Sequence, residues 1–147
     1  MANEYGKIFE NHITGLVCTL NGKFLFASDE QGNLKQFSID DGILVADYGV
    51  AMDYGIFTMT LTMDGKYLFL GILRGMLRQW GIREAAVVKH FGKVHKNSIV
   101  GLGASRDANV LVSADSGGDL MIWDIAARAI DDFIHFEGMR VTAACLI

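Results

Sequence analysis

The sequence predicts an all-β protein built from three four-stranded antiparallel units, and two positional patterns carry this prediction. An aromatic residue recurs every 43 residues, as Phe37, Trp80 and Trp123. A glycine ahead of it recurs at the same interval, as Gly32, Gly75 and Gly118. This period lies within the roughly 40–45 residues that form one four-stranded blade of a β-propeller. We therefore expect three propeller blades that form an incomplete ring.

The composition is that of a single folded domain spanning residues 1–147. Of the 147 residues, 51% are hydrophobic and 10% aromatic, which is ample for a packed core. The formal net charge is −4 with both signs interspersed, so no global field attracts nucleic acid or an anionic membrane surface. The sequence has no secretory signal and no apolar stretch of membrane-spanning length. We expect protein partners, with no nucleic acid and no membrane among them.

The two cysteines, Cys18 and Cys145, lie in apolar runs and not at disulfide or metal-ligand spacings. Free cysteine is among the most buried residue types, so both thiols are predicted to be buried. A reduced chain in the cytoplasm is the corresponding expectation. The sequence predicts no bound metal and no cofactor.

The first repeat begins with a strand from Ile13 to Leu20, turns at Asn21-Gly22 and returns from Lys23 to Ser28. Asn-Gly favours a type I′ hairpin turn, because both residues tolerate positive φ. The second repeat has Asp64-Gly65 at this place, whereas Asp107-Ala108 in the third predicts a different turn or a longer loop. A short apolar patch within Ala2–Asn11 is compatible with the outer strand of a preceding blade.

The third strand of each repeat carries the recurring aromatic residue, and a less regular fourth strand follows it. The fourth strands are expected at Ile43–Tyr48, Ala86–Phe91 and Ala129–Phe136. Charged residues such as Lys89, Asp131 and Asp132 favour outer edges for these strands. The repeats then span about 13–49, 56–92 and 99–136, and residues 137–147 open a partial fourth repeat.

The strands are apolar on both faces, which indicates sheets packed between other sheets. In the first strands, the large residues Leu16, Met59 and Leu102 share one face. The opposite face carries small residues at the equivalent positions, Gly15, Thr58 and Gly101. Large side chains of one blade can therefore fill the space left by small side chains of the next.

The third repeat resembles the WD40 family most closely. That family has a histidine before the first strand, a hydroxyl residue on the second strand and a Trp-Asp pair at the end of the third. In this repeat, those places are taken by His95, Ser113 and Trp123-Asp124. The resemblance implies a buried network of these four residues and a non-catalytic protein-interaction role. The acidic residue that the family often places before the turn glycine is replaced by Gln31, Arg74 and Gly117, so we expect a network without its usual carboxylate. Repeats one and two read Phe37-Ser38 and Trp80-Gly81, which predicts apolar packing there.

The residue groups that resemble catalytic motifs have simpler interpretations. Gly101-Leu102-Gly103-Ala104-Ser105 lacks the spacing of a nucleotide loop or a nucleophile elbow. Adjacent Asp131 and Asp132 would point to opposite faces of a strand. A basic cluster is either a charged connection or a surface for an acidic partner; it comprises Lys89, His90, Lys93, His95 and Lys96.

We therefore predict a scaffold and not an enzyme. Two alternatives stay open: a structural subunit of a cytoskeletal or ciliary assembly, and the non-catalytic portion of an enzyme whose active site lies outside this chain. A ring of four blades at this period needs about 172 residues, more than the 147 present. The chain is thus expected to be part of a longer propeller or to be completed by other chains, including copies of itself.

The flanking blades should carry the new contacts. They are predicted on the strand from Val141 to Ile147 and around Leu16, Phe24 and Phe26. Individual candidate partner contacts are residues of the loops and of the last predicted strand: Glu30, Tyr54, Arg74, Lys93, Lys96, Arg140, Val141 and Leu146.

Overall fold

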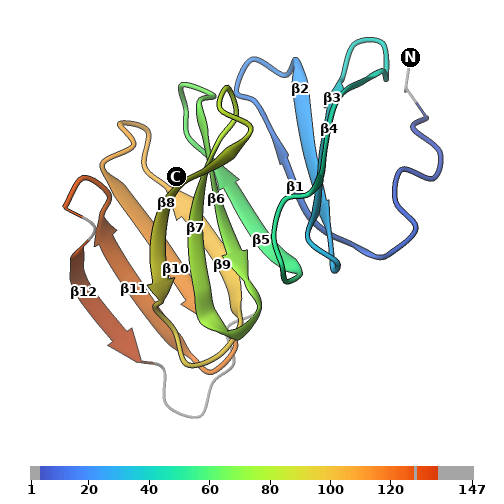
Figure 1. The fold of residues 1–147 in the computed structure, drawn as a ribbon. Helices are drawn as coiled ribbons and strands as arrows, with labels where there is room; N and C mark the ends of the chain where they lie inside the picture. The colour runs from blue at the N-terminus through green and yellow to red at the C-terminus, as the bar shows by residue number, and fades with distance from the viewer. Residues whose placement is uncertain (1–3, 128, 136–147) are drawn as a thin grey trace.

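The computed structural model describes residues 4–127 and 129–135, which form three four-stranded antiparallel sheets (Figure 1). The first sheet comprises β1 (Ile13–Cys18), β2 (Phe24–Asp29), β3 (Asn33–Ser38) and β4 (Leu44–Val50). The second comprises β5 (Ile56–Leu61), β6 (Tyr67–Ile72), β7 (Met76–Gly81) and β8 (Ala86–Lys93). The third comprises β9 (Ile99–Ala104), β10 (Val110–Asp115), β11 (Asp119–Asp124) and β12 (Ala129–His135).

The predicted all-β architecture is confirmed. Within each sheet the strands pair in chain order, and the only helical segment of the described residues is a 3₁₀ turn, Leu73–Gly75. No helix in this part of the chain is long and apolar enough to cross a membrane. The first strands contact one another, β1 on β5 and β5 on β9, while each fourth strand lies at the far edge of its sheet. Each sheet is therefore a blade with its first strand innermost.

The blades are joined by two apolar cores. Phe26 of the first blade packs with Met59, Leu68 and Trp80 of the second. On the other side of the second blade, Phe69 packs among residues of the third: Ile99, Leu102, Leu111, Met121 and Trp123. Both faces of the middle blade are thus covered, as the two-sided apolar pattern of its strands predicts.

The predicted type I′ turns between first and second strands are wrong. Gly22 and Gly65 have positive φ, but Asn21 and Asp64 do not. A five-residue loop replaces each turn. In the first loop, the hydroxyl of Thr19 accepts the backbone N–H of Phe24 at 3.0 Å and donates to Asn21 at 2.7 Å, and in the second, the hydroxyl of Thr62 accepts the backbone N–H of Tyr67 at 3.1 Å and donates to Asp64 at 2.6 Å. These side-chain bonds offer the backbone a longer alternative to a tight turn.

The third repeat uses this same loop, contrary to the expectation of a different one. Ser105 Oγ accepts the backbone N–H of Val110 at 3.0 Å and lies 2.5 Å from a carboxylate oxygen of Asp107. Ala108 takes the glycine's place with φ +57°. The loop is therefore fixed by its hydroxyl and carboxylate residues, and its glycine can be replaced at a cost of about 1–2 kcal/mol in backbone strain.

The segment before β1 is not a strand, so its interpretation as an outer strand of a preceding blade is wrong for residues 4–12. Phe9 is buried against Ala27 and Phe37 on the outward face of the first blade. The ring of Tyr5 meets that of Phe37 edge to face, with centroids 5.6 Å apart. The segment is held by these side chains and covers part of a face that has no neighbouring blade among the described residues.

The rest of that outward face is open to solvent. Leu16 and Cys18 lie on it and are exposed, so the prediction of a buried Cys18 thiol is wrong. Cys145 lies outside the described residues. Phe24 and Phe26, predicted to lie on the same flank as Leu16, instead face the second blade. Side chains alternate along a strand, so the two sets of residues point in opposite directions.

Candidate functional site

A polar network lies between the second and third blades. His95, on the connection from β8 to β9, places Nε2 2.7 Å from Oγ of Ser113 on β10. Trp123 on β11 donates its indole N–H to the same oxygen at 2.9 Å. All three residues are buried. Because the hydroxyl oxygen of Ser113 accepts the indole N–H, the hydroxyl can donate its own proton to Nε2 of His95. The neutral imidazole then carries its N–H proton on Nδ1.

Asp115 places a carboxylate beside this network, although Gly117 stands where the family has its usual acid. Oδ2 of Asp115 lies 3.6 Å from Nδ1 of His95, which is too long for a hydrogen bond, and Nδ1 has no hydrogen-bond partner among the described residues. Oδ1 accepts the backbone N–H groups of Gly117 and Asp119 at 2.9 and 3.0 Å. Burial alone would raise the pKa of Asp115, but these bonds and those from Asn97 outweigh it and lower the pKa. The carboxylate is thus held ionised facing the imidazole.

The sequence indicates Asp115 through its equivalence to Asp29, although the family pattern places its acid at another position. The carboxylate stands two residues before Gly117, the position that the family pattern gives to an acid. Asp29 precedes it by two repeat periods and makes the same turn, since its Oδ1 accepts the backbone N–H groups of Gln31 and Asn33 at 2.9 Å. Asp124, predicted to join the network, instead accepts the backbone N–H of Ala127 at 2.7 Å and closes the turn after β11.

The equivalent positions in the other two blades are apolar, as the sequence predicts. Phe9, Ala27 and Phe37 stand there in the first blade, and the second has Met52, Leu70 and Trp80. The indole N–H of Trp80 has no hydrogen-bond partner among the described residues. Among the described residues, the hydrogen-bonded chain of His95, Ser113 and Trp123 therefore belongs to the third blade alone.

Acid should weaken this network. Burial lowers the pKa of His95, and the opposing charges of Asp115 and Asp119 do not restore it. The unfolded chain binds a proton on this residue near pH 6.5, whereas the folded chain binds it only at lower pH. The free energy of unfolding should therefore fall as pH drops below about 6.5, by at most about 1.4 kcal/mol per pH unit for one proton.

Urea unfolding between about pH 7.5 and 5 measures this, above the range near pH 4 in which the carboxylates of the unfolded chain titrate. The matched variant is His95→Met, since methionine stands at the equivalent Met52. Its stability should change less over the same pH range. Equal pH dependence in the two proteins would contradict the assignment.

The predicted partner residues of the loops lie in two places: one includes Tyr54 and Arg74, and the other Lys93 and Lys96. Arg74 lies over the ring of Tyr54, 5.5 Å from its centroid. Glu30 lies on the same end of the blades and is 3.4 Å from His12. The structure thus brings Tyr54 and Arg74 together. Three other candidates, Arg140, Val141 and Leu146, lie outside the described residues.

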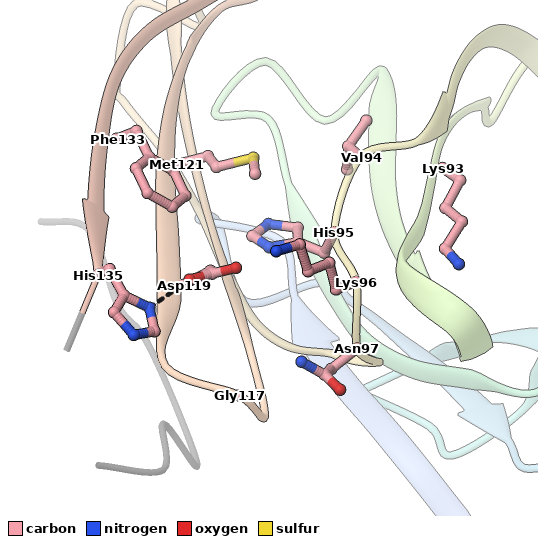
Figure 2. A pocket seen from close by; sticks show the side chains of 10 residues that line it. All are labelled: Lys93, Val94, His95, Lys96, Asn97, Gly117, Asp119, Met121, Phe133 and His135. Carbon is pink, nitrogen blue, oxygen red and sulfur yellow. Dashed lines mark hydrogen bonds and ion pairs between the residues drawn. The ribbon is translucent and has the colours of Figure 1, made fainter. Parts of the chain in front are cut away.

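Lys93 and Lys96 line a cavity of about 700 Å³ on the third blade. One wall carries Asp119, Met121, Phe133 and His135 from β11 and β12, and the connection at residues 94–97 faces it (Figure 2). Nδ1 of His135 lies 2.5 Å from Oδ1 of Asp119. Among residues 4–127 and 129–135, no cluster of three or more His, Cys, Asp and Glu side chains is arranged to hold a metal ion.

Comparison with known proteins identifies the fold. No protein-family model matches the sequence, and no curated protein does. Two similar solved structures are "Structure of U3-55K", 19% identical with a TM-score of 0.84, and "Crystal structure of RRP9 WD40 repeats", 20% identical with a TM-score of 0.84. Each match covers 95% of this chain but only 44% and 43% of the respective solved chain.

The protein class is therefore defined at the level of fold. The three sheets are blades of the WD40-repeat β-propeller type. The chain spans less than half the length of the solved structures it matches.

Proposed function

We propose that this chain is a non-catalytic, cytoplasmic protein-interaction scaffold whose open blade faces dock onto further propeller blades. One observation carries the proposal. Leu16 is 59% exposed, whereas Met59 and Leu102, at the same position of the next two blades, are 7% and 6% exposed. Those two positions are covered by a neighbouring blade. The face of the first blade is built like theirs, which supports the same kind of cover for it.

The third blade offers a second open face. Val112 is only half-buried, although Phe26 and Phe69 at its equivalent positions are 1% and 0% exposed. Ile134 on β12 is paired with Leu120 of β11 and shares this outward face. Fully burying an aliphatic side chain of this size contributes roughly 1.5–3 kcal/mol, so covering such a face favours association.

A blade is the occupant that suits these faces best. The two interfaces within the chain already join an apolar sheet face to the next sheet through close-packed side chains. The further blade can come from a second copy, from another protein or from more of a longer polypeptide. Structural neighbours built from WD40 repeats support a scaffold over a small-molecule site.

The reactivity of the Cys18 thiol measures directly whether the outward face of the first blade is covered. It is exposed and shares this face with Leu16, because alternate residues of β1 point the same way. With Cys145→Ser, Cys18 is the only thiol of the chain. We expect its reaction with a maleimide to slow as protein concentration rises from about 1 to 100 μM, the range in which weak interfaces form.

Two leucine variants make the test specific. Leu16→Glu places a charge on the open face and should keep Cys18 reactive at every concentration. Leu20→Glu makes the same change at a residue that is 74% exposed in the β1–β2 loop, so protection should persist. A labelling rate of Cys18 that does not depend on concentration would contradict docking between copies, and the scaffold would then require another chain in the same assay.

A further inference from the structure

The cavity beside His95 has a counterpart in each of the other two blades. The counterparts have volumes of about 430 Å³ in the first blade and about 80 Å³ in the second, against about 700 Å³ in the third. One position on the third strand of each blade lines all three cavities and differs among them: Lys35, Arg78 and Met121. The two smaller cavities have a basic residue at this position, and the third has methionine.

In the first blade, a lysine crosses the cavity. Nζ of Lys35 donates to the carbonyl of Ile8 at 2.9 Å and lies 3.6 Å from a carboxylate oxygen of Asp47. It also lies 5.0 Å from the centre of the Phe9 ring. The basic side chain thus bridges the connection before the blade and its outer strand.

In the second blade, an arginine fills most of the space. The guanidinium of Arg78 donates to the carbonyl of Leu77 at 3.2 Å, and its other terminal nitrogen lies 3.7 Å from the sulfur of Met76. The side chain is folded against its own strand. A small remnant lined by Tyr54 and Arg78 is all that is left of the cavity.

In the third blade, no basic side chain from this position enters the cavity. Met121 is buried and turns into the core between the second and third blades. Phe133, which pairs with Met121 across β11 and β12, adds an aromatic wall (Figure 2). The space therefore stays open, with an apolar floor.

The rim of this cavity also has a different charge. In the first blade, Lys7 and Glu10 form an ion pair of 2.6 Å at the cavity's edge. Their equivalents in the third blade are Lys93 and Lys96, two cations, and no ion pair joins either of them to another described residue. The carboxylate of Asp119 on the wall is largely buried and is already bonded to His135. The rim therefore favours an anionic occupant.

We propose that this cavity binds an acidic peptide segment, with its carboxylates paired to Lys93 and Lys96 on the rim and a neighbouring apolar side chain on Met121 and Phe133. Charge complementarity selects the acidic residue, and burial of the apolar neighbour supplies affinity. A peptide fits better than a nucleic acid because the floor is apolar and the chain as a whole carries a net charge of −4. The site lies on the face of the third blade that is turned toward the second blade, away from Leu16. Peptide binding there therefore does not depend on the open faces of the flanking blades.

Fluorescence anisotropy with a labelled eight-residue peptide of alternating glutamate and leucine tests the proposal. Its glutamine counterpart should bind about 10-fold or more weakly, and binding of the acidic peptide should weaken as salt rises. The double variant Lys93→Glu and Lys96→Glu should lose binding by at least the same factor. Lys89→Glu is the matched control, because Lys89 lines a different cavity, and it should change the affinity less than about twofold.

A second variant tests the cavity itself. Met121→Lys introduces the residue found at Lys35, whose blade is folded with a smaller cavity, and should reduce peptide binding while leaving the circular dichroism spectrum unchanged. The proposal is overturned if the glutamine peptide binds as well as the acidic one, or if Lys89→Glu weakens binding as much as the rim variants. Tighter binding of a labelled single-stranded RNA, or no peptide binding at about 1 mM, also overturns it.

Discussion

Replacing Trp123 by alanine should lower the free energy of unfolding by about 3–5 kcal/mol through the cavity it leaves. The loss also removes the indole donor from the buried hydroxyl of Ser113, which adds about 1–3 kcal/mol. Urea unfolding at pH 7.5, where His95 is neutral, measures the sum. This is the largest effect we expect from a single substitution in the chain.

Trp80→Ala is the matched control, because the two tryptophans are equivalent in the repeat and are 5% and 4% exposed. The indole N–H of Trp80 has no described partner, so its loss should cost the packing contribution alone. We therefore expect Trp123→Ala to be the more destabilising of the two. Equal losses of unfolding free energy would show that the bond to Ser113 adds nothing. A loss under about 1 kcal/mol for Trp123→Ala would be typical of a surface substitution and would contradict the network.

Gly75→Ala should destabilise the chain by about 2–5 kcal/mol. Gly75 has φ +77°, where a Cβ is strained, and the added Cβ would lie 2.0 Å from the carbonyl oxygen of His95. That carbonyl belongs to the connection between blades, so it cannot yield without moving His95 away from Ser113. Thermal and urea unfolding both report the loss.

Gly65→Ala separates the two causes. Gly65 has φ +70°, but no atom lies within 4 Å of the place its Cβ would take. It should therefore show the backbone cost alone, about 1–2 kcal/mol. If Gly75→Ala were no worse than Gly65→Ala, the turn would not be packed against the His95 connection as described.

The repeat interval made the blades predictable. Positions 43 residues apart perform the same task in each blade, so the alternation in the first strands and the spacing of the tryptophans were enough to predict the three sheets. The loops were less predictable. Asn-Gly favours a tight turn in isolation, but the hydroxyl of Thr19 stabilises a longer loop through side-chain bonds that a dipeptide pattern does not contain.

The candidate site was predictable only in part. His95, Ser113 and Trp123 could be found because their residue types follow a known pattern, whereas Asp115 was missed because it stands two residues from the expected position. The exposure of Cys18 depends on whether another blade covers its face, which no local pattern records. The cavity beside Lys96 arises from Met121 standing where other blades have a cation, and only the aligned repeats reveal that difference.

The central claim is that the outward faces of the flanking blades are docking surfaces. Sedimentation velocity of the purified chain between about 1 and 100 μM tests it most directly. We expect the sedimentation coefficient to rise with concentration, and Leu16→Glu to keep it at the monomer value. A monomer throughout this range that unfolds cooperatively and binds no hydrophobic dye would contradict the claim, because the open faces would then be stable in water without a partner.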